Sequence, residues 1–289
     1  MRFLLIFIFV VSLSAEKVLI INSNSGVQKY NNVIETFQDT FSYPHTILDI
    51  STMSSKEIKE YLYDNYPDLV YCVGNKAYQY AYKYLPEKKI FFSSVVNWKR
   101  LPATQKLYGI SNELHGGVEL TLITTIFKDV KKIGIVYSKY TQDLYENLHK
   151  YALKMGIKLI AKQINKPTDV DFKKLLDQTD AFLIIPDPVL LSSKNDVEKL
   201  FRVSKHLKKP IFAYDELFIQ YGAVLVISVD TPTIGRQAAV MMENIIADKK
   251  IKKIQYPIGT SIIFNKKVAQ EMGIKYDLNS LSIVNEIVE

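Results

Sequence analysis

Polar and aromatic side chains follow several apolar segments of this sequence, and their types suit the binding of a small polar molecule. Carboxylates pair with ammonium groups, hydroxyl and amide groups hydrogen-bond to polar atoms, and aromatic rings stack on apolar ones. In open α/β sheets, ligands bind beyond the carboxyl ends of the strands. The candidate ligand-binding residues that this rule selects are Asn24, Ser25, Asn75, Ser93, Ser94, Trp98, Tyr137, Tyr140, Asp187 and Asp215.

Several of these candidates have a structural alternative. Asn and Ser side chains commonly cap helices, which applies to Asn24, Ser25 and Asn75. Asp187 precedes a proline, as turn residues do, and Asp215 stands where it would cap a following helical turn. For Trp98, the only tryptophan of the sequence, the alternative is a role in packing the lobes of the fold.

The sequence carries none of the common catalytic signatures. It has no glycine-rich dinucleotide motif after a strand, no phosphate loop and no Gly-x-Ser-x-Gly elbow. Its four histidines are scattered, and its single cysteine, Cys72, lies inside the apolar run Leu69–Val73, as a buried small hydrophobe does. We therefore expect no catalytic residue, no metal and no cofactor, and an enzyme is the less favoured interpretation.

The candidate residues need a scaffold of alternating strands and helices. Apolar runs of strand length, such as Phe182–Ile185, alternate with helix-period segments, such as Val27–Phe41, along nearly the whole chain. Ser54 and Glu57 have the spacing of a capping box at the start of another helix. Strict alternation of this kind predicts parallel sheets covered by helices on both faces, and two successive series predict two doubly wound lobes.

The N-terminal segment predicts export. Met1 and Arg2 precede nine apolar residues, Phe3–Val11, and small residues around Ala15 then suit cleavage. This is the pattern of a secretory signal peptide over residues 1–15, and the apolar run is too short to span a bilayer comfortably. No cysteine stands near the cleavage site, so we expect a periplasmic protein without a lipid anchor. The alternative is an uncleaved N-terminal anchor.

The net charge of +7 does not by itself indicate nucleic acid. The lysines are spread along the 289 residues, and many have acidic neighbours. The one dense basic run, within 248–253, follows a predicted helix, where cations offset the helix dipole. We expect a monomer with no nucleic-acid partner.

Several segments, taken in order, resemble the ABC-transporter substrate-binding proteins of the tryptophan/tyrosine-uptake type. The similar segments are 107–111, 130–137, 222–223 leading to Asp230, 234–239, and 265–274. The resemblance covers roughly residues 16–289 and implies a type I periplasmic-binding fold, α/β in class, whose two doubly wound parallel-sheet lobes are joined by three crossovers.

The resemblance also implies where the chain crosses between lobes. The crossings are expected near Tyr108–Asn112, Ser228–Asp230 and Pro257–Ser261. The N-terminal lobe is then 16–110 plus 231–257, and the C-terminal lobe is 111–230 plus 258–289. Family members usually carry a His-Pro segment after the first strand, which Asn22–Tyr30 lacks.

The sequence thus predicts a solute-binding protein of an ABC importer that closes around an amino acid or related metabolite. Its partners would be that small molecule and an ABC permease in the inner membrane, and a sugar suits the same side chains. The first alternative is a sensory binding module that reports to a receptor or sensor kinase. The second is an enzyme on the same scaffold.

Overall fold

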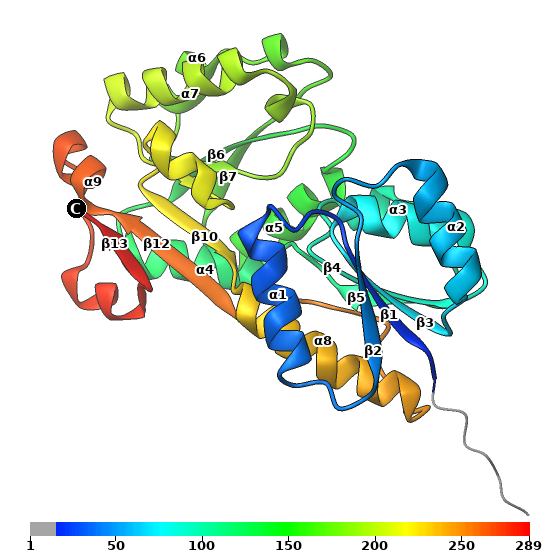
Figure 1. Cartoon of the computed structure of the whole chain (residues 1–289). Helices are drawn as coiled ribbons and strands as arrows, with labels where there is room; N and C mark the ends of the chain where they lie inside the picture. Colours follow the sequence, from blue (N-terminus) through cyan, green and yellow to red (C-terminus); the bar gives the residue numbers. More distant parts are fainter. Residues whose placement is uncertain (1–15) are drawn as a thin grey trace, which may run out of the picture.

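A computed structural model describes residues 16–289 and shows two α/β lobes side by side (Figure 1). The predicted signal peptide, residues 1–15, lies outside the described residues. Among the residues described, no helix is both long and apolar enough to cross a membrane.

The N-terminal lobe is built on a parallel sheet of six strands, in the order β11-β5-β4-β3-β1-β2. Helices α1 (Gln28–Gln38) and α8 (Thr231–Ile246) share one core cluster with this sheet, while α2 (Ser55–Asn65) and α3 (Asn75–Tyr84) share the other, so they cover opposite faces. The strands are β1 (Val18–Asn22), β2 (His45–Asp49), β3 (Leu69–Val73), β4 (Lys89–Ser93), β5 (Leu107–Ile110) and β11 (Ile254–Gln255).

The C-terminal lobe has a sheet of seven strands, in the order β13-β12-β10-β9-β8-β6-β7. Helices α4 (Gly116–Ile126) and α5 (Gln142–Lys154) pack in one core cluster, with α9 (Lys266–Met272); α6 (Phe172–Asp177) and α7 (Lys194–Leu207) pack in the other. The strands are β6 (Lys132–Tyr137), β7 (Lys158–Gln163), β8 (Ala181–Ile184), β9 (Ile211–Ala213), β10 (Leu225–Val229), β12 (Thr260–Asn265) and β13 (Glu286–Val288). Five 3-10 helices complete the described chain: η1 (Trp98–Arg100), η2 (Pro167–Asp169), η3 (Leu190–Ser192), η4 (Glu216–Tyr221) and η5 (Leu278–Ile283).

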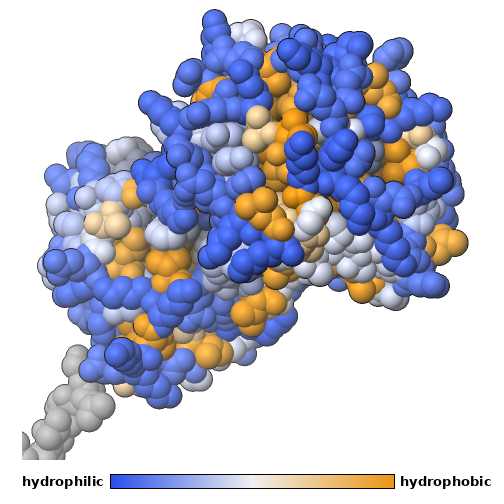
Figure 2. Space-filling model, turned by 180° about the vertical axis from the view of Figure 1, so that it is seen from behind, coloured by the Kyte–Doolittle hydropathy of each residue, from blue (hydrophilic) through white to orange (hydrophobic). Residues whose placement is uncertain are grey.

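The strand sequences explain why both sheets lie inside their lobes. All five residues of β1 and of β3 are buried, as expected for continuous apolar strands covered on both faces. The surface is correspondingly polar: on the face shown in Figure 2, hydrophilic residues cover most of both lobes and hydrophobic residues appear between them in small groups. The predicted capping box is confirmed, because the Ser54 hydroxyl accepts from the Glu57 amide while the Glu57 carboxylate accepts from the Ser54 amide.

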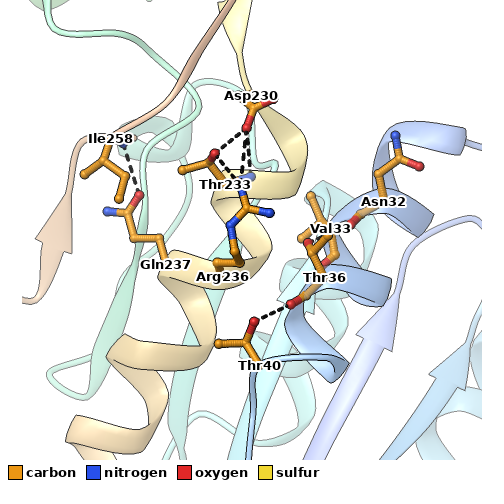
Figure 3. Close-up of polar contacts among 9 residues, drawn as sticks. All are labelled: Asn32, Val33, Thr36, Thr40, Asp230, Thr233, Arg236, Gln237 and Ile258. Atoms are coloured by element: carbon orange, nitrogen blue, oxygen red, sulfur yellow. Dashed lines mark hydrogen bonds and ion pairs between the residues drawn. The ribbon is translucent and has the colours of Figure 1, made fainter.

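The chain passes between the two sheets three times, between β5 and α4, between β10 and α8, and between β11 and β12. Helix α8 ties two of these crossings together (Figure 3). Asp230 caps α8 by accepting from the Thr233 amide at 3.0 Å, and the Gln237 side chain accepts from the Ile258 amide at 3.2 Å. The exact lobe boundaries remain a prediction: 16–110 plus 231–257 for the N-terminal lobe, and 111–230 plus 258–289 for the C-terminal lobe. The assignment of the strands to the two sheets supports these boundaries.

The structure differs from the sequence expectation in several elements. Strand β12 is antiparallel to β10, because the second crossing leaves the C-terminal sheet at β10 and the third returns to it at β12. The short strands β11 and β13 have too few residues for a periodic pattern to reveal them.

Candidate ligand-binding cleft

A cavity of about 230 Å³ lies between the lobes, walled by residues of both. Its wall in the N-terminal lobe comes from the start of α1 and the loop after β4. Its wall in the C-terminal lobe comes from α4, α5 and the loops after β8 and β9. The crossing segments close the remainder. The residues that line it are Val27, Lys29, Tyr30, Ser94, Val96, Asn112, Glu113, Leu114, Glu119, Leu144, Ile185, Pro186, Tyr214, Asp215, Ile227, Ser228, Val229 and Thr231.

Four of the residues selected from the sequence line this region. Ser94 and Asp215 line the interlobe cavity. Trp98 and Tyr140 line a neighbouring cavity of about 250 Å³, which shares Glu113, Leu114 and Leu144 with the first. The structure thus brings residues after β4, β6 and β9 to one gap between the lobes, as the strand-end rule expects.

Two candidates after β1 lie away from both cavities, in an exposed loop. The Asn24 side chain accepts from the Gly26 amide at 2.8 Å. The Ser25 hydroxyl donates to the Asp49 carboxylate at 2.5 Å. These bonds fix the turn that leads into α1.

Three further candidates support the site from within a lobe. The Asn75 side chain makes two hydrogen bonds to the backbone of Val96, at 3.0 and 3.2 Å, and so holds the loop that carries Ser94. Ser93 is fully buried, and its hydroxyl bonds to the Tyr71 hydroxyl at 2.7 Å. Tyr137 stacks on Tyr145 of α5, with ring centroids 4.2 Å apart.

Asp187 is fully buried, and its carboxylate already accepts four hydrogen bonds. One oxygen accepts from the Ser138 amide at 2.7 Å and from the Thr141 hydroxyl. The other accepts from the amides of Val189 and Leu190, both at 2.9 Å. These bonds tie the loop after β8 to the loop after β6, and they leave little acceptor capacity for a ligand.

Asp215 faces the opposite lobe across the cavity. Its carboxylate accepts from the Lys29 ammonium of α1 at 3.0 Å, and the same ammonium lies 3.1 Å from Glu216. Desolvation of the Lys29 ammonium acts against its charged form, but the two neighbouring carboxylates outweigh it and raise the pKa of Lys29. Asp215 also caps η4 by accepting from the Leu217 amide at 2.9 Å.

The loop after β4 reaches across to the C-terminal lobe. Asn97 donates from its side chain to the Pro186 carbonyl at 2.9 Å, and from its backbone amide to Glu113 at 3.1 Å. Ser94 and Asn97 both have positive φ, of 56° and 54°, a strained conformation that is common at binding sites. Lys99 pairs with Asp143 of α5 beside this contact.

Two carboxyl groups, of the half-buried Glu113 and the buried Glu119, line the cavity without having been selected from the sequence. Glu113 accepts from the Ser111 hydroxyl and from the Asn97 amide, and burial raises its pKa in spite of these bonds. Glu119, in the first turn of α4, is only 7% exposed, and burial raises its pKa to about 7. Glu119 lies inside α4 and Glu113 lies just before it, so a rule that considers only the ends of strands does not select them.

The remaining chemical candidates of the sequence lie apart from the cavity. Cys72 is a free cysteine, fully buried inside β3, and burial raises the pKa of its thiol, so no reactive thiolate forms there. No cluster of three or more potential metal ligands occurs within residues 16–289.

The chain thus has a two-lobed α/β fold with three connecting crossings and a cavity between the lobes, and the cavity is lined by apolar, aromatic and charged residues. The family model for ABC transporter substrate binding proteins matches residues 27–287, and the chain belongs to this family. The resemblance stated from the sequence is thereby confirmed, and the family that the chain belongs to is described as one of substrate-binding proteins.

Similar proteins are found in two bacterial species. A tyrosine-binding protein of Clostridioides difficile (strain R20291) is 24% identical over 232 residues, which cover 75% of this chain and 65% of the relative. The structure of an ABC domain in complex with L-Trp from Streptococcus pneumonia has a TM-score of 0.64 at 17% identity, and the match covers 95% of this chain and all of that one.

A third similar structure is the ligand-free, open form of a substrate-binding protein with adhesive properties from Clostridium difficile. Its TM-score is 0.73 at 15% identity, over 94% of this chain and 99% of that one. These likenesses confirm the type I periplasmic-binding fold that was predicted from the sequence.

Proposed function

We propose that this protein is the solute-binding protein of an ABC importer and that it binds an amino acid or a related metabolite between its lobes. The observation that carries this proposal is the interlobe cavity, to which α1 supplies Lys29 and Tyr30 while the opposite lobe supplies Glu119, Tyr214 and Asp215. A ligand held by both lobes binds the closed form more tightly than the open form and so favours closure. The closed form would then be recognised by the permease.

The relatives support the amino-acid class of ligand. One carries tyrosine binding in its name, and a similar structure holds L-Trp. The cavity of about 230 Å³ adjoins the second cavity of about 250 Å³, and the two together fall within the range of about 300–1,000 Å³ that is usual for small-molecule sites. Tyr30 and Tyr214 offer faces for stacking on an aromatic side chain. In this proposal the protein acts as a monomer in the periplasm, after export directed by residues 1–15.

A thermal-shift screen of the purified protein tests the proposal. The panel comprises the standard amino acids, their amine derivatives, common sugars and small organic acids. A ligand present at about 100 times its Kd stabilises the native state by about 2.7 kcal/mol, which raises the Tm of a chain of this size by roughly 5 °C or more. We expect this shift with an amino acid. The absence of a shift with every compound would contradict a small-solute function.

Two variants check that the shift reports on the cleft. Lys29→Gln removes the cation from the cavity wall and should weaken ligand stabilisation. Lys56→Gln is the control for the loss of a lysine charge, because Lys56 pairs with Glu60 within α2 and does not line the cavity. Equal ligand shifts in both variants would place the binding site outside the cleft.

A further inference from the structure

Glu119 is a buried carboxyl group that faces the interlobe cavity without a partner. It is the fourth residue of α4, between Val118 and Leu120, and it lines the cavity wall. Within residues 16–289 no hydrogen bond or ion pair to its carboxyl group is present, and burial alone accounts for its raised pKa. A buried carboxyl group of this kind is stabilised when a donor or a cation reaches it.

The other carboxylates of the cavity wall already have partners. Glu113 accepts from the Ser111 hydroxyl and the Asn97 amide. Asp215 is paired with Lys29 and accepts from the Leu217 amide. Among the carboxyl groups of this wall, Glu119 is therefore the one that has no hydrogen-bond or ion-pair partner within residues 16–289.

The charges around the cavity favour a cation. The wall contains three carboxyl groups, of Glu113, Glu119 and Asp215, against the one ammonium group of Lys29. This local excess of acid stands in a chain whose formal net charge is +7. A wall with more carboxyl groups than ammonium groups attracts ligands of positive charge.

We propose that Glu119 binds the protonated amine of the ligand, which restricts the ligand to the class of ammonium compounds: amino acids and the amines derived from them. This inference rests on the proposed function and names the chemical group that the site selects. An ammonium group has three donors for the carboxylate oxygens, and a charge-assisted hydrogen bond of this kind is among the stronger polar contacts. A deaminated acid offers no such donor.

Isothermal titration calorimetry on sets of three compounds tests the inference. Each set contains an amino acid, its decarboxylated amine and its deaminated acid; tyrosine, tyramine and 3-(4-hydroxyphenyl)propionate form one set, and tryptophan and leucine supply two more. We expect the amino acid or the amine of at least one set to bind, and the deaminated acid of that set to bind at least tenfold more weakly. This factor corresponds to the loss of one hydrogen bond to a charged group.

The variant Glu119→Gln keeps the size and shape of the side chain and removes its charge. It should lower the affinity for the amine-bearing compound by about 10- to 100-fold and leave the affinity for the deaminated acid within about threefold. Glu146→Gln is the matched control, because Glu146 lies on the exposed side of α5 with Gln142 as its hydrogen-bond partner. The control should bind like the original protein.

The outcomes separate the inference from the proposed function. A deaminated acid that binds as tightly as its amino acid overturns the role of Glu119 and leaves the small-solute function standing. The same conclusion follows if Glu119→Gln lowers the affinities for the amine and the acid equally, because a general distortion of the cleft would do that. No binding by any member of the sets, together with no shift in the wider thermal screen, overturns both.

Discussion

Asp187 is expected to stabilise the fold rather than to contact the ligand. Asp187→Ala would remove the acceptor of four donors in the loops after β6 and β8. Only the Ser138 amide keeps a second acceptor, the Thr141 hydroxyl at 3.3 Å. Buried unsatisfied donors cost about 1–3 kcal/mol each, with partial relief by water and by relaxation. We expect a loss of roughly 3 kcal/mol in the free energy of unfolding, measured by urea denaturation of the ligand-free protein.

The matched control for that prediction is Asp215→Ala. The side chain of Asp215 is 36% exposed and its Lys29 partner 34% exposed, so solvent screening limits their pairing to at most about 1 kcal/mol. An Asp187→Ala protein that is as stable as the original but no longer binds ligand would contradict the role of Asp187 in stabilising the fold. It would indicate that Asp187 contacts the ligand.

The two residues that carry most of the argument about the ligand, Lys29 and Glu119, were not predicted from the sequence. The strand-end rule points to loops, and it found Ser94 and Asp215. Lys29 and Glu119 lie inside helices, where a charged residue ordinarily faces solvent. Glu119 did leave a signal, because it is the only charged residue of the apolar helix α4. The tertiary arrangement decides which side of a helix faces the other lobe, and the periodicity of the sequence does not contain this information.

At the scale of elements, the alternation of strands and helices was predictable because each element buries a stripe or face of its own sequence. Helix α1 shows this, since Val33, Ile34 and Phe37 recur at helical spacing and all three are buried. Elements that form only by pairing with a segment far away in the sequence could not be predicted from periodicity. Strand β11 exists because Ile254 and Gln255 pair with Gly109 and Ile110 of β5, about 145 residues earlier.

Close packing of α1 against α8 is expected to depend on Gly235. A Cβ atom at this position would lie 2.1 Å from the Thr36 hydroxyl and 2.3 Å from the Val33 carbonyl, so Gly235→Ala must push the two helices apart (Figure 3 shows the α1 residues). Overpacking costs about 1–3 kcal/mol, partly offset by the better helix propensity of alanine, which is worth about 1 kcal/mol. We expect a net loss of roughly 1–2 kcal/mol in urea denaturation.

Gly117→Ala provides the control for Gly235→Ala. Gly117 also lies in a helix, but a Cβ atom there would meet only side-chain atoms, at 3.1 Å from Tyr151 and farther from His115. Because Lys29 and Tyr30 stand on α1, Gly235→Ala should also weaken ligand binding through displacement of that helix. If the Gly235→Ala and Gly117→Ala proteins have equal free energies of unfolding, the prediction is wrong, because α1 and α8 would then move apart without loss of stability.

At the scale of the whole molecule, few ion pairs and hydrogen bonds outside the crossings link the two lobes around the cavity within residues 16–289. On one side Lys29 of α1 pairs with Asp215 and Glu216. On the other side Lys99 pairs with Asp143 of α5, beside the bond from Asn97 to the Pro186 carbonyl. The lysines are at least one third exposed, so each pairing contributes at most about 1 kcal/mol to closure. An equilibrium between open and closed forms is therefore expected to be sensitive to salt and to charge.

The double variant Lys29→Gln, Lys99→Gln tests this expectation. Loss of both cross-lobe pairings, worth about 2 kcal/mol together at most, shifts the ratio of open to closed protein by up to roughly 30-fold. We expect a larger radius of gyration in small-angle scattering of the ligand-free protein at low salt, and little further change at about 1 M salt, where ion pairs are already screened. The control Lys56→Gln, Lys173→Gln removes the same charge from pairs that lie within α2 and within α6, one in each lobe, and should scatter like the original protein. If both double variants have the radius of gyration of the original protein at every salt concentration, the prediction is wrong. The crossings alone would then set the distance between the lobes, without a contribution from Lys29 and Lys99.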